Sequence, residues 1–143
     1  MKAFLPLAAA ICTFVLHTLP QGVVTDFINA HRHLAKADSE EFWKDRLLPD
    51  SSDDDLRYEL LVIGEEAIAE TALNDFLQAI ESDGFDLLLR ARDRAEGLDL
   101  YVKMKQDKVT RVFMRGLDRG EMAFVQLSGS WTPAELLERY KPD

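Results

Sequence analysis

The sequence predicts an α+β domain built on a single five-stranded, mostly antiparallel sheet. Residues 85–130 contain four runs in which apolar and polar side chains alternate, with turn-forming residues between them. Such alternation predicts an antiparallel meander, because successive side chains of a strand face opposite sides of the sheet. Upstream, an apolar run at 58–64 precedes a helical pattern at 65–82. We therefore expect a strand–helix–strand unit followed by the meander, with a central helix packed on the sheet and further helices at both ends.

The alternation is clearest in the second predicted strand of the meander. There, Leu98, Leu100, Val102 and Met104 alternate with Asp99, Tyr101, Lys103 and Lys105. Turns at 93–97, 106–108 and 117–120 separate this strand from its neighbours and divide the last two strands.

The helical pattern at 65–82 is the strongest in the chain. Its apolar residues recur at spacings of three and four and form one stripe: Ala69, Ala72, Leu73, Phe76, Leu77 and Ile80. Gly84 supplies the left-handed residue that ends this helix.

Helices are also predicted nearer the two ends. Residues 23–36 have an apolar side, and a second helix starts at Asp38 or Ser39 and ends before Pro49. At the C-terminus, Thr132, Pro133 and Glu135 form a helix start in which the threonine caps the first turn.

Residues 1–22 have the composition of a secretory signal peptide. Lys2 precedes a largely apolar run at 3–16, which is shorter than the roughly 20 residues needed to span a bilayer. We expect the segment to be cleaved and the protein to be exported, to the periplasm in a bacterium, with residues 23–143 forming a single domain. A retained membrane anchor, a helix of the folded domain and a lipoprotein modified at Cys12 are the alternatives.

Composition excludes several classes of function. The chain has 17 Lys and Arg against 26 Asp and Glu, a net charge of −9, so it is not expected to bind nucleic acid. Cleavage near Gly22 would remove Cys12, the one cysteine, and with it any disulfide, thiolate nucleophile or cysteine-ligated zinc.

No pattern in the sequence indicates a catalytic, cofactor or metal site. His31 and His33 point about 200° apart on a helix, so they cannot share a metal ion. The acidic run at 50–55 lacks the glycine and glutamate positions of an EF-hand loop, and no nucleophile elbow or phosphate loop is present. We expect a protein that is not an enzyme, with an undetected hydrolase as a remaining alternative.

The charges are unevenly distributed along the chain. Residues 85–119 hold nine Lys or Arg and six Asp or Glu, whereas the rest is strongly acidic. The alternation places several cations on one sheet face with aromatic residues between them, and this candidate partner surface comprises Arg90, Arg92, Tyr101, Lys103, Lys105, Arg111, Phe113 and Arg115. The arginines either pair with nearby carboxylates and cover apolar surface with their stems, or meet an anionic or protein partner.

Residues 58–140, within a core of about 56–141, resemble the bacterial family named domain of unknown function 4252. Four stretches carry the resemblance: Tyr58-Glu59-Leu60-Leu61-Val62, Ile80-Glu81-Ser82-Asp83-Gly84-Phe85, Leu98-Asp99-Leu100-Tyr101-Val102-Lys103 and Phe124-Val125-Gln126-Leu127-Ser128-Gly129. The resemblance implies export and a compact α+β fold, and it implies no catalytic residue. The helical, acidic segment before residue 56 departs from the family pattern.

We therefore expect an exported interaction module of the bacterial cell envelope, whose partner is an envelope protein or an anionic surface. The alternative is a small-molecule or lipid-binding protein with an apolar pocket between the helix at 65–82 and the sheet. A deep cavity beneath that helix would favour the alternative, and a basic, aromatic sheet face would favour the interaction module.

Overall fold

A computed structural model describes residues 22–49 and 56–141. The predicted signal peptide up to residue 21, Cys12 and the acidic run at 50–55 lie outside the described residues. None of the helices in the described ranges has the length and apolar character needed to cross a membrane.

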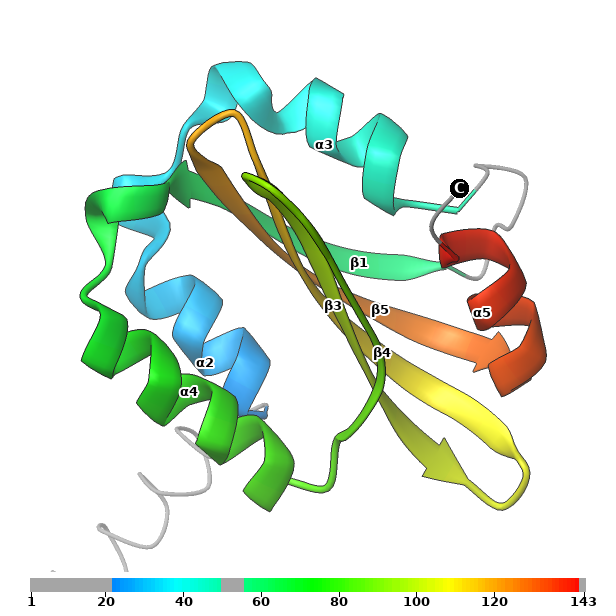
Figure 1. The fold of residues 1–143 in the computed structure, drawn as a ribbon. Coiled ribbons are helices and arrows are strands. Elements are labelled where there is room, and N and C mark those ends of the chain that lie inside the picture. The colour runs from blue at the N-terminus through cyan, green and yellow to red at the C-terminus, as the bar shows by residue number, and fades with distance from the viewer. Residues whose placement is uncertain (1–21, 50–55, 142–143) are drawn as a thin grey trace, which may run out of the picture.

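The sheet has five antiparallel strands in the order β1-β5-β4-β3-β2. The strands are β1 (Arg57–Gly64), β2 (Asp86–Asp93), β3 (Glu96–Lys105), β4 (Lys108–Asp118) and β5 (Glu121–Trp131). β2 to β5 form the meander, and β1 pairs with β5 at the far edge (Figure 1). The predicted α+β fold and meander are confirmed. The strand–helix–strand unit, however, connects the two opposite edges of the sheet.

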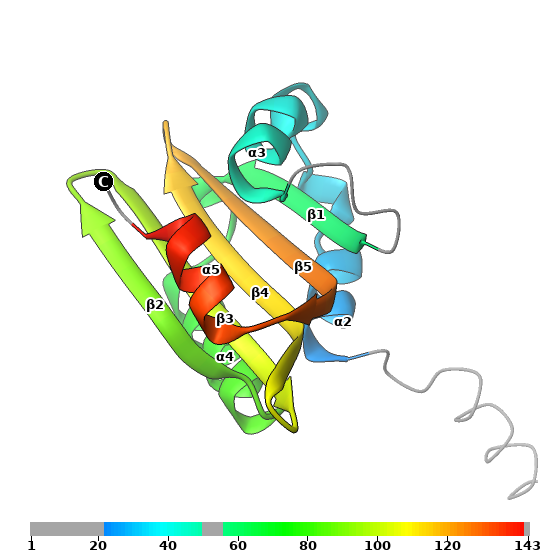
Figure 2. The same ribbon diagram turned by 90° about the vertical axis from the view of Figure 1, so that its right-hand side faces the viewer.

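Helices cover both faces of this sheet. The helices are α2 (Val23–Ala30), α3 (Glu40–Leu47), α4 (Glu70–Ser82) and α5 (Pro133–Tyr140). One face lies against α2 and α4, and the other lies against α3 and α5 (Figures 1 and 2). The result is a three-layer domain with the sheet in the middle.

Each sheet face has its own hydrophobic cluster. Leu60 and Val62 of β1 belong to the cluster under α3 and α5, and Leu61 and Ile63 belong to the one under α2 and α4. A strand buried on both faces is apolar at every position, which explains why residues 60–63 form a continuous apolar run without alternation.

The first predicted helix is too long, because tertiary contacts interrupt it. α2 ends at Ala30, and a 3₁₀ turn follows at Arg32–Leu34. Beyond α2, the Arg32 guanidinium donates to the Leu60 carbonyl oxygen at 3.1 Å, and the Lys36 N–H donates to the Val62 carbonyl oxygen at 2.8 Å. This segment therefore lies along the outer edge of β1 and cannot continue as a regular helix.

The predicted helix at 65–82 is also divided. Glu65–Ala67 is a 3₁₀ turn, and α4 begins at Glu70. The Glu65 N–H donates to the Gly120 carbonyl oxygen at 2.8 Å, which ties the chain to the β4–β5 turn before α4 can start.

The two predicted helix caps have different outcomes. Ser39 occupies the N-cap position of α3 but makes no side-chain cap; its hydroxyl donates instead to Glu121 of β5. At α5, Thr132 Oγ1 accepts the Glu135 N–H at 3.1 Å, as predicted, and Pro133 occupies the first turn.

Candidate partner-binding surface

Three arginines converge on Asp99 in the middle of the β2–β3–β4 part of the sheet. In the strand register, Asp99 of β3 lies opposite Arg90 of β2 and opposite Arg115 of β4. Side chains at paired positions share a sheet face, so this register brings the groups together. Arg115 Nη2 and Nε donate to Asp99 Oδ2 at 2.6 and 3.0 Å. Arg90 Nε donates to Oδ1 at 3.0 Å, and Arg92 Nη2 donates to Oδ2 at 2.9 Å.

The cluster has a surplus of positive charge, and the surplus is exposed. The Asp99 side chain is 0% exposed and that of Arg115 10%, whereas those of Arg90 and Arg92 are 49% and 38% exposed. One carboxylate against three guanidinium groups leaves two uncompensated charges. Because Arg115 is buried against Asp99, the surplus reaches solvent through Arg90 and Arg92.

The carboxylate stays ionised in this surrounding. Burial alone would raise the pKa of Asp99, but the hydrogen bond from Arg92, the charge of Arg115 and the hydrogen bond from Arg90 outweigh burial and hold the pKa below the usual aspartate value. In return, the hydrogen bond that Arg90 donates to Asp99 and the negative charge of Asp99 raise the pKa of Arg90.

The aromatic members of the predicted surface are core residues. Tyr101 and Phe113 are buried in the cluster under α2 and α4, where the Phe113 ring lies 5.5 Å from that of Phe76 and 6.3 Å from that of Phe124. The Tyr101 hydroxyl still reaches the arginine cluster, since Arg90 Nη2 donates to it at 3.3 Å. Burial raises the pKa of Tyr101, as does the charge of Asp99. Neither ring forms part of an exposed surface.

The remaining predicted cations have other surroundings. Lys103 Nζ lies 3.0 Å from Asp83 Oδ2, just after α4, and 5.0 Å from the centre of the Phe85 ring. Lys105 is exposed at the end of β3, and Arg111 lines a separate polar cavity. The structure thus brings together Arg90, Arg92 and Arg115, and places Lys103, Lys105 and Arg111 elsewhere.

Asp99, which organises the cluster, was not among the predicted site residues. Sequence alternation places it on the same side as Tyr101 and Lys103, and nothing further identifies it. Its role depends on the register of three strands, which a single sequence does not define.

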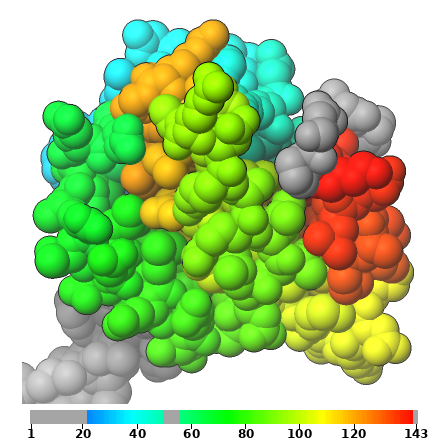
Figure 3. All heavy atoms as spheres, viewed as in Figure 1, coloured from blue at the N-terminus to red at the C-terminus, as the bar shows by residue number. Residues whose placement is uncertain are grey.

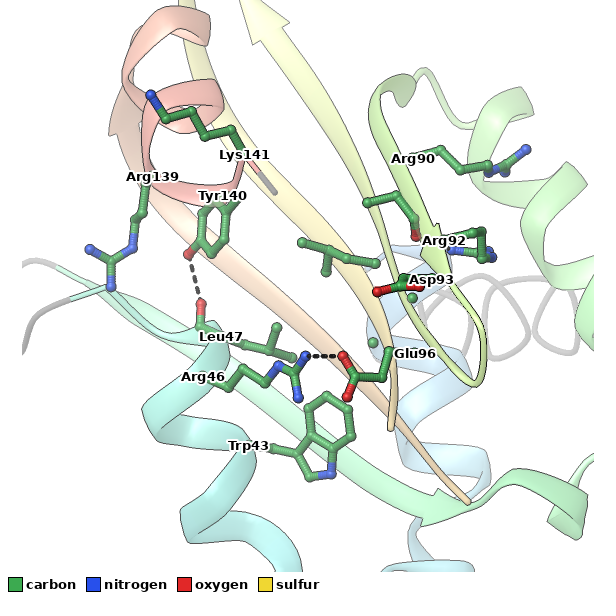
Figure 4. Close-up of a pocket in the computed structure, with 14 residues that line it drawn as sticks. Trp43, Arg46, Leu47, Arg90, Arg92, Asp93, Glu96, Arg139, Tyr140 and Lys141 are labelled. Carbon is green, nitrogen blue, oxygen red and sulfur yellow. Dashed lines mark hydrogen bonds and ion pairs between the residues drawn. The ribbon is translucent and has the colours of Figure 1, made fainter. Parts of the chain in front are cut away.

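A groove lies on the opposite sheet face, between β2 and the helices α3 and α5. It has a volume of about 870 Å³, and its walls include Trp43 and Leu47 of α3, Leu98 of β3 and Tyr140 of α5. Arg90 and Arg92 of β2 also line the groove. Figure 4 shows the helix residues facing the β2–β3 hairpin, and it shows the guanidinium groups of Arg90 and Arg92 directed away from these helix residues.

Polar contacts stabilise the walls of this groove. The Tyr140 hydroxyl donates to the Leu47 carbonyl oxygen at 2.6 Å and joins α5 to α3. Arg46 Nη2 lies 3.6 Å from Glu96 Oε2 and joins α3 to the β2–β3 hairpin (Figure 4). The groove is therefore framed by three elements, of which α3 is bonded to both of the others.

Between the arginine cluster and the groove, β2 forms an edge of the sheet. It pairs with β3 on one side, and no backbone partner on its other side is found among residues 22–49 and 56–141. At the opposite edge, β1 receives hydrogen bonds from Arg32 and Lys36. The β2–β3 hairpin lies open at the centre of the space-filling view in Figure 3, with α4 on its left and α5 on its right.

The family model described as domain of unknown function (DUF4252) matches residues 59–138, more than half of the chain. The chain belongs to this family. The match begins in β1 and ends in α5, so it contains the whole meander, the Asp99 cluster and the strand side of the groove, but not its α3 wall. No curated protein and no solved structure matches the chain.

Within the described ranges, no group of three or more His, Cys, Asp or Glu is arranged to hold a metal ion. His31 directly follows α2 as its C-cap, and its Nδ1 lies 2.7 Å from the Phe27 carbonyl oxygen. His33 lies in the following 3₁₀ turn.

Proposed function

We propose that this member of the DUF4252 family is an exported, non-enzymatic interaction module of the bacterial cell envelope, and that it binds an acidic segment of a partner protein along the edge of β2. The observation that carries the proposal is the charge surplus at Asp99. Arg90 and Arg92 expose about half and about two fifths of their side chains on this edge, while Asp99, which is itself bound by Arg115, holds them in place.

A protein partner suits the edge better than a lipid surface does. β2 offers backbone N–H and C=O groups over eight residues, Asp86–Asp93, and an extended peptide is the ligand that pairs with such groups. Arg90 and Arg92 would attract acidic side chains by charge complementarity, because guanidinium groups bind carboxylates through paired hydrogen bonds. Charged side chains at an edge also oppose indiscriminate strand pairing, which favours a partner of opposite charge over a second copy of the same basic edge.

The alternative of an apolar pocket beneath α4 gains no support. The space between α2, α4 and the sheet holds Phe27, Phe76, Phe113 and Phe124, and the Phe27 and Phe76 rings are stacked at 3.7 Å. The groove beside α3 and α5 lies on the opposite sheet face, and the cavity lined by Arg111 is polar, lies beside α2 and has no α4 residue in its lining.

A crosslinking pull-down from envelope extracts tests the proposal. The wild-type protein is compared with Arg90→Gln/Arg92→Gln and with the matched control Lys105→Gln/Lys108→Gln, which removes two charges at the β3–β4 turn. We expect one partner to be crosslinked to β2 through an acidic segment, lost in the arginine variant and retained in the control. Equal capture by the wild type and the arginine variant would contradict the proposal. So would arginine-dependent binding to vesicles of anionic lipid without a protein partner, since that result assigns the arginines to a membrane surface.

A further inference from the structure

A second cavity, of about 390 Å³, opens between α2 and strands β1, β5 and β4, and its lining is polar and charged. We infer that it is a binding site for a small zwitterion, a ligand of amino-acid size that carries both an ammonium group with N–H donors and an acidic group. The residues that line it are Thr25, Arg57, Tyr58, Glu59, Arg111, Gln126 and Ser128.

A directed chain of hydrogen bonds ends at the Glu59 carboxylate. Gln126 Nε2 donates to Thr25 Oγ1 at 3.0 Å, and Thr25 Oγ1 donates to Glu59 Oε1 at 3.0 Å. The threonine hydroxyl has one proton, and it is used on Glu59. Oε1 is therefore satisfied from within the protein.

The other oxygen of the same carboxylate has no donor. Glu59 Oε2 is buried and lacks a hydrogen-bond partner among the described residues. A buried acceptor without a donor is costly, and native proteins rarely leave one unpaired. Since the acceptor is a carboxylate beside a cavity, the ligand group that fits it best is an ammonium, whose N–H donors form charge-assisted hydrogen bonds.

Donors for an acidic group lie on the same side of the sheet, two residues before Glu59 along β1 and at the positions in register with that residue on β5 and β4. Ser128 of β5 is opposite Arg57 of β1 and also opposite Arg111 of β4, so the two arginines flank one hydroxyl across three neighbouring strands. Neighbouring strands are about 4.8 Å apart, which puts both guanidinium groups within reach of one carboxylate or phosphate.

The distance between the two arginines and the Glu59 carboxylate determines the size of the ligand. Arg57 and Glu59 are two residues apart on β1 and face the same side, about 7 Å from each other along the strand. A short zwitterion bridges that distance, especially since arginine side chains can extend toward it. The cavity volume of about 390 Å³ is close to the smallest volume typical of ligand pockets, which is about 300 Å³. A cavity of this size disfavours a lipid or a long peptide.

This site does not depend on the proposed function. Its residues come from α2, β1, β5 and β4, and β2 contributes none. Arg111, which the sequence placed with the partner surface, belongs to this cavity.

NMR titrations test the inference. They use the protein purified in the form in which it accumulates in cells. The probes are glycine, β-alanine, γ-aminobutyrate and the common α-amino acids, with propionate, propylammonium and glycine betaine as analogues that lack one charge or the N–H donors. We expect at least one zwitterion to cause saturable shifts at Thr25, Ser128 and the Gln126 side-chain amide. The analogues should bind at least tenfold more weakly.

Variants make the test specific. Glu59→Gln keeps a side chain that can accept from Thr25 but removes the charge, and Arg111→Gln removes one donor group. Each should weaken binding about tenfold or more, a loss of about 1.4 kcal/mol, and Lys105→Gln should leave binding unchanged. The absence of saturable shifts for every zwitterion up to about 10 mM, well above an ordinary millimolar Kd, would overturn the inference. Unchanged binding by Glu59→Gln would do the same.

Discussion

Arg115 of β4 donates two hydrogen bonds to Asp99 of β3, and both side chains are buried in a sheet face that is largely apolar. The pair joins neighbouring strands and supports Arg90 and Arg92 at the edge. The buried pair therefore couples the stability of the domain to the position of its exposed positive charge.

Replacing Asp99 should destabilise the fold. Asp99→Asn leaves Arg115 buried without its counter-charge, and breaking a buried ion pair in this way typically costs about 3 kcal/mol or more. Urea unfolding measures the effect, with Asp93→Asn on the exposed end of β2 as the control. If the two variants lose the same stability, Asp99 does not have the structural role assigned to it.

Stability should fall in acid, and Asp99 should contribute to that fall. The pKa of Asp99 is lowered against the opposing effect of burial by the bonds from the arginines. The hydrogen bond from Ser39 lowers the pKa of Glu121, again against burial, with further help from Trp43 and Lys36. Both groups bind protons less readily in the folded state, so their stabilisation is full above about pH 4 to 5, near the unfolded pKa values, and is lost as pH falls through the folded ones.

Thermal unfolding between pH 7 and pH 3 measures this dependence. Asp99→Asn should have a lower Tm than the wild type at pH 7. Its Tm should then fall less than that of the wild type between pH 7 and pH 3. Parallel curves for the two proteins would be inconsistent with the lowered pKa.

Gly116 of β4 should not tolerate a side chain. A Cβ there would lie 2.5 Å from Trp43 Cζ3, so Gly116→Ala would push α3 away from the sheet. Overpacking of this kind costs about 1–3 kcal/mol. Gly64→Ala is the matched control, since nothing lies within 4 Å of its Cβ position. Chemical denaturation should show a clear loss for the first variant and little change for the second; equal midpoints would contradict the packing.

The mass of the mature protein should correspond to cleavage of the signal peptide near Gly22. The predicted leader has one positive charge before a short apolar run. Intact mass measurement on the protein from its envelope fraction should give a chain that lacks Cys12. A full-length mass would contradict export through cleavage, and a lipid-sized mass increase with Cys12 at the new N-terminus would identify a lipoprotein.

Sequence periodicity was sufficient to predict the strands of the sheet but insufficient to predict their order and the ends of the connecting helices. Alternation between residues such as Leu98 and Asp99 predicts strands, and the Thr132 cap predicts the last helix, because both signals are local. The position of β1 at the edge opposite β2 depends on pairing between residues about sixty positions apart, such as Leu61 and Phe124. The end of α2 similarly depends on hydrogen bonds from Arg32 and Lys36 to a distant strand.

The candidate site was predictable only in part, because its charges can be read from the sequence but its strand pairing cannot. Charge counting identified the basic segment, and two of its cations, Arg90 and Arg92, lie exposed on the β2 edge. It could not show that Tyr101 faces the interior, since a strand covered by helices on both faces buries both sets of alternating residues.

The central claim is that a partner protein pairs with the edge of β2. Hydrogen exchange of the backbone amides of Asp86–Asp93, with and without the crosslinked partner or a synthetic peptide of its acidic segment, tests it most directly. We predict slower exchange on the outward-facing amides of β2, abolished in Arg90→Gln/Arg92→Gln and retained in Lys105→Gln/Lys108→Gln. Unchanged exchange along β2, with protection appearing at another surface, would contradict the claim.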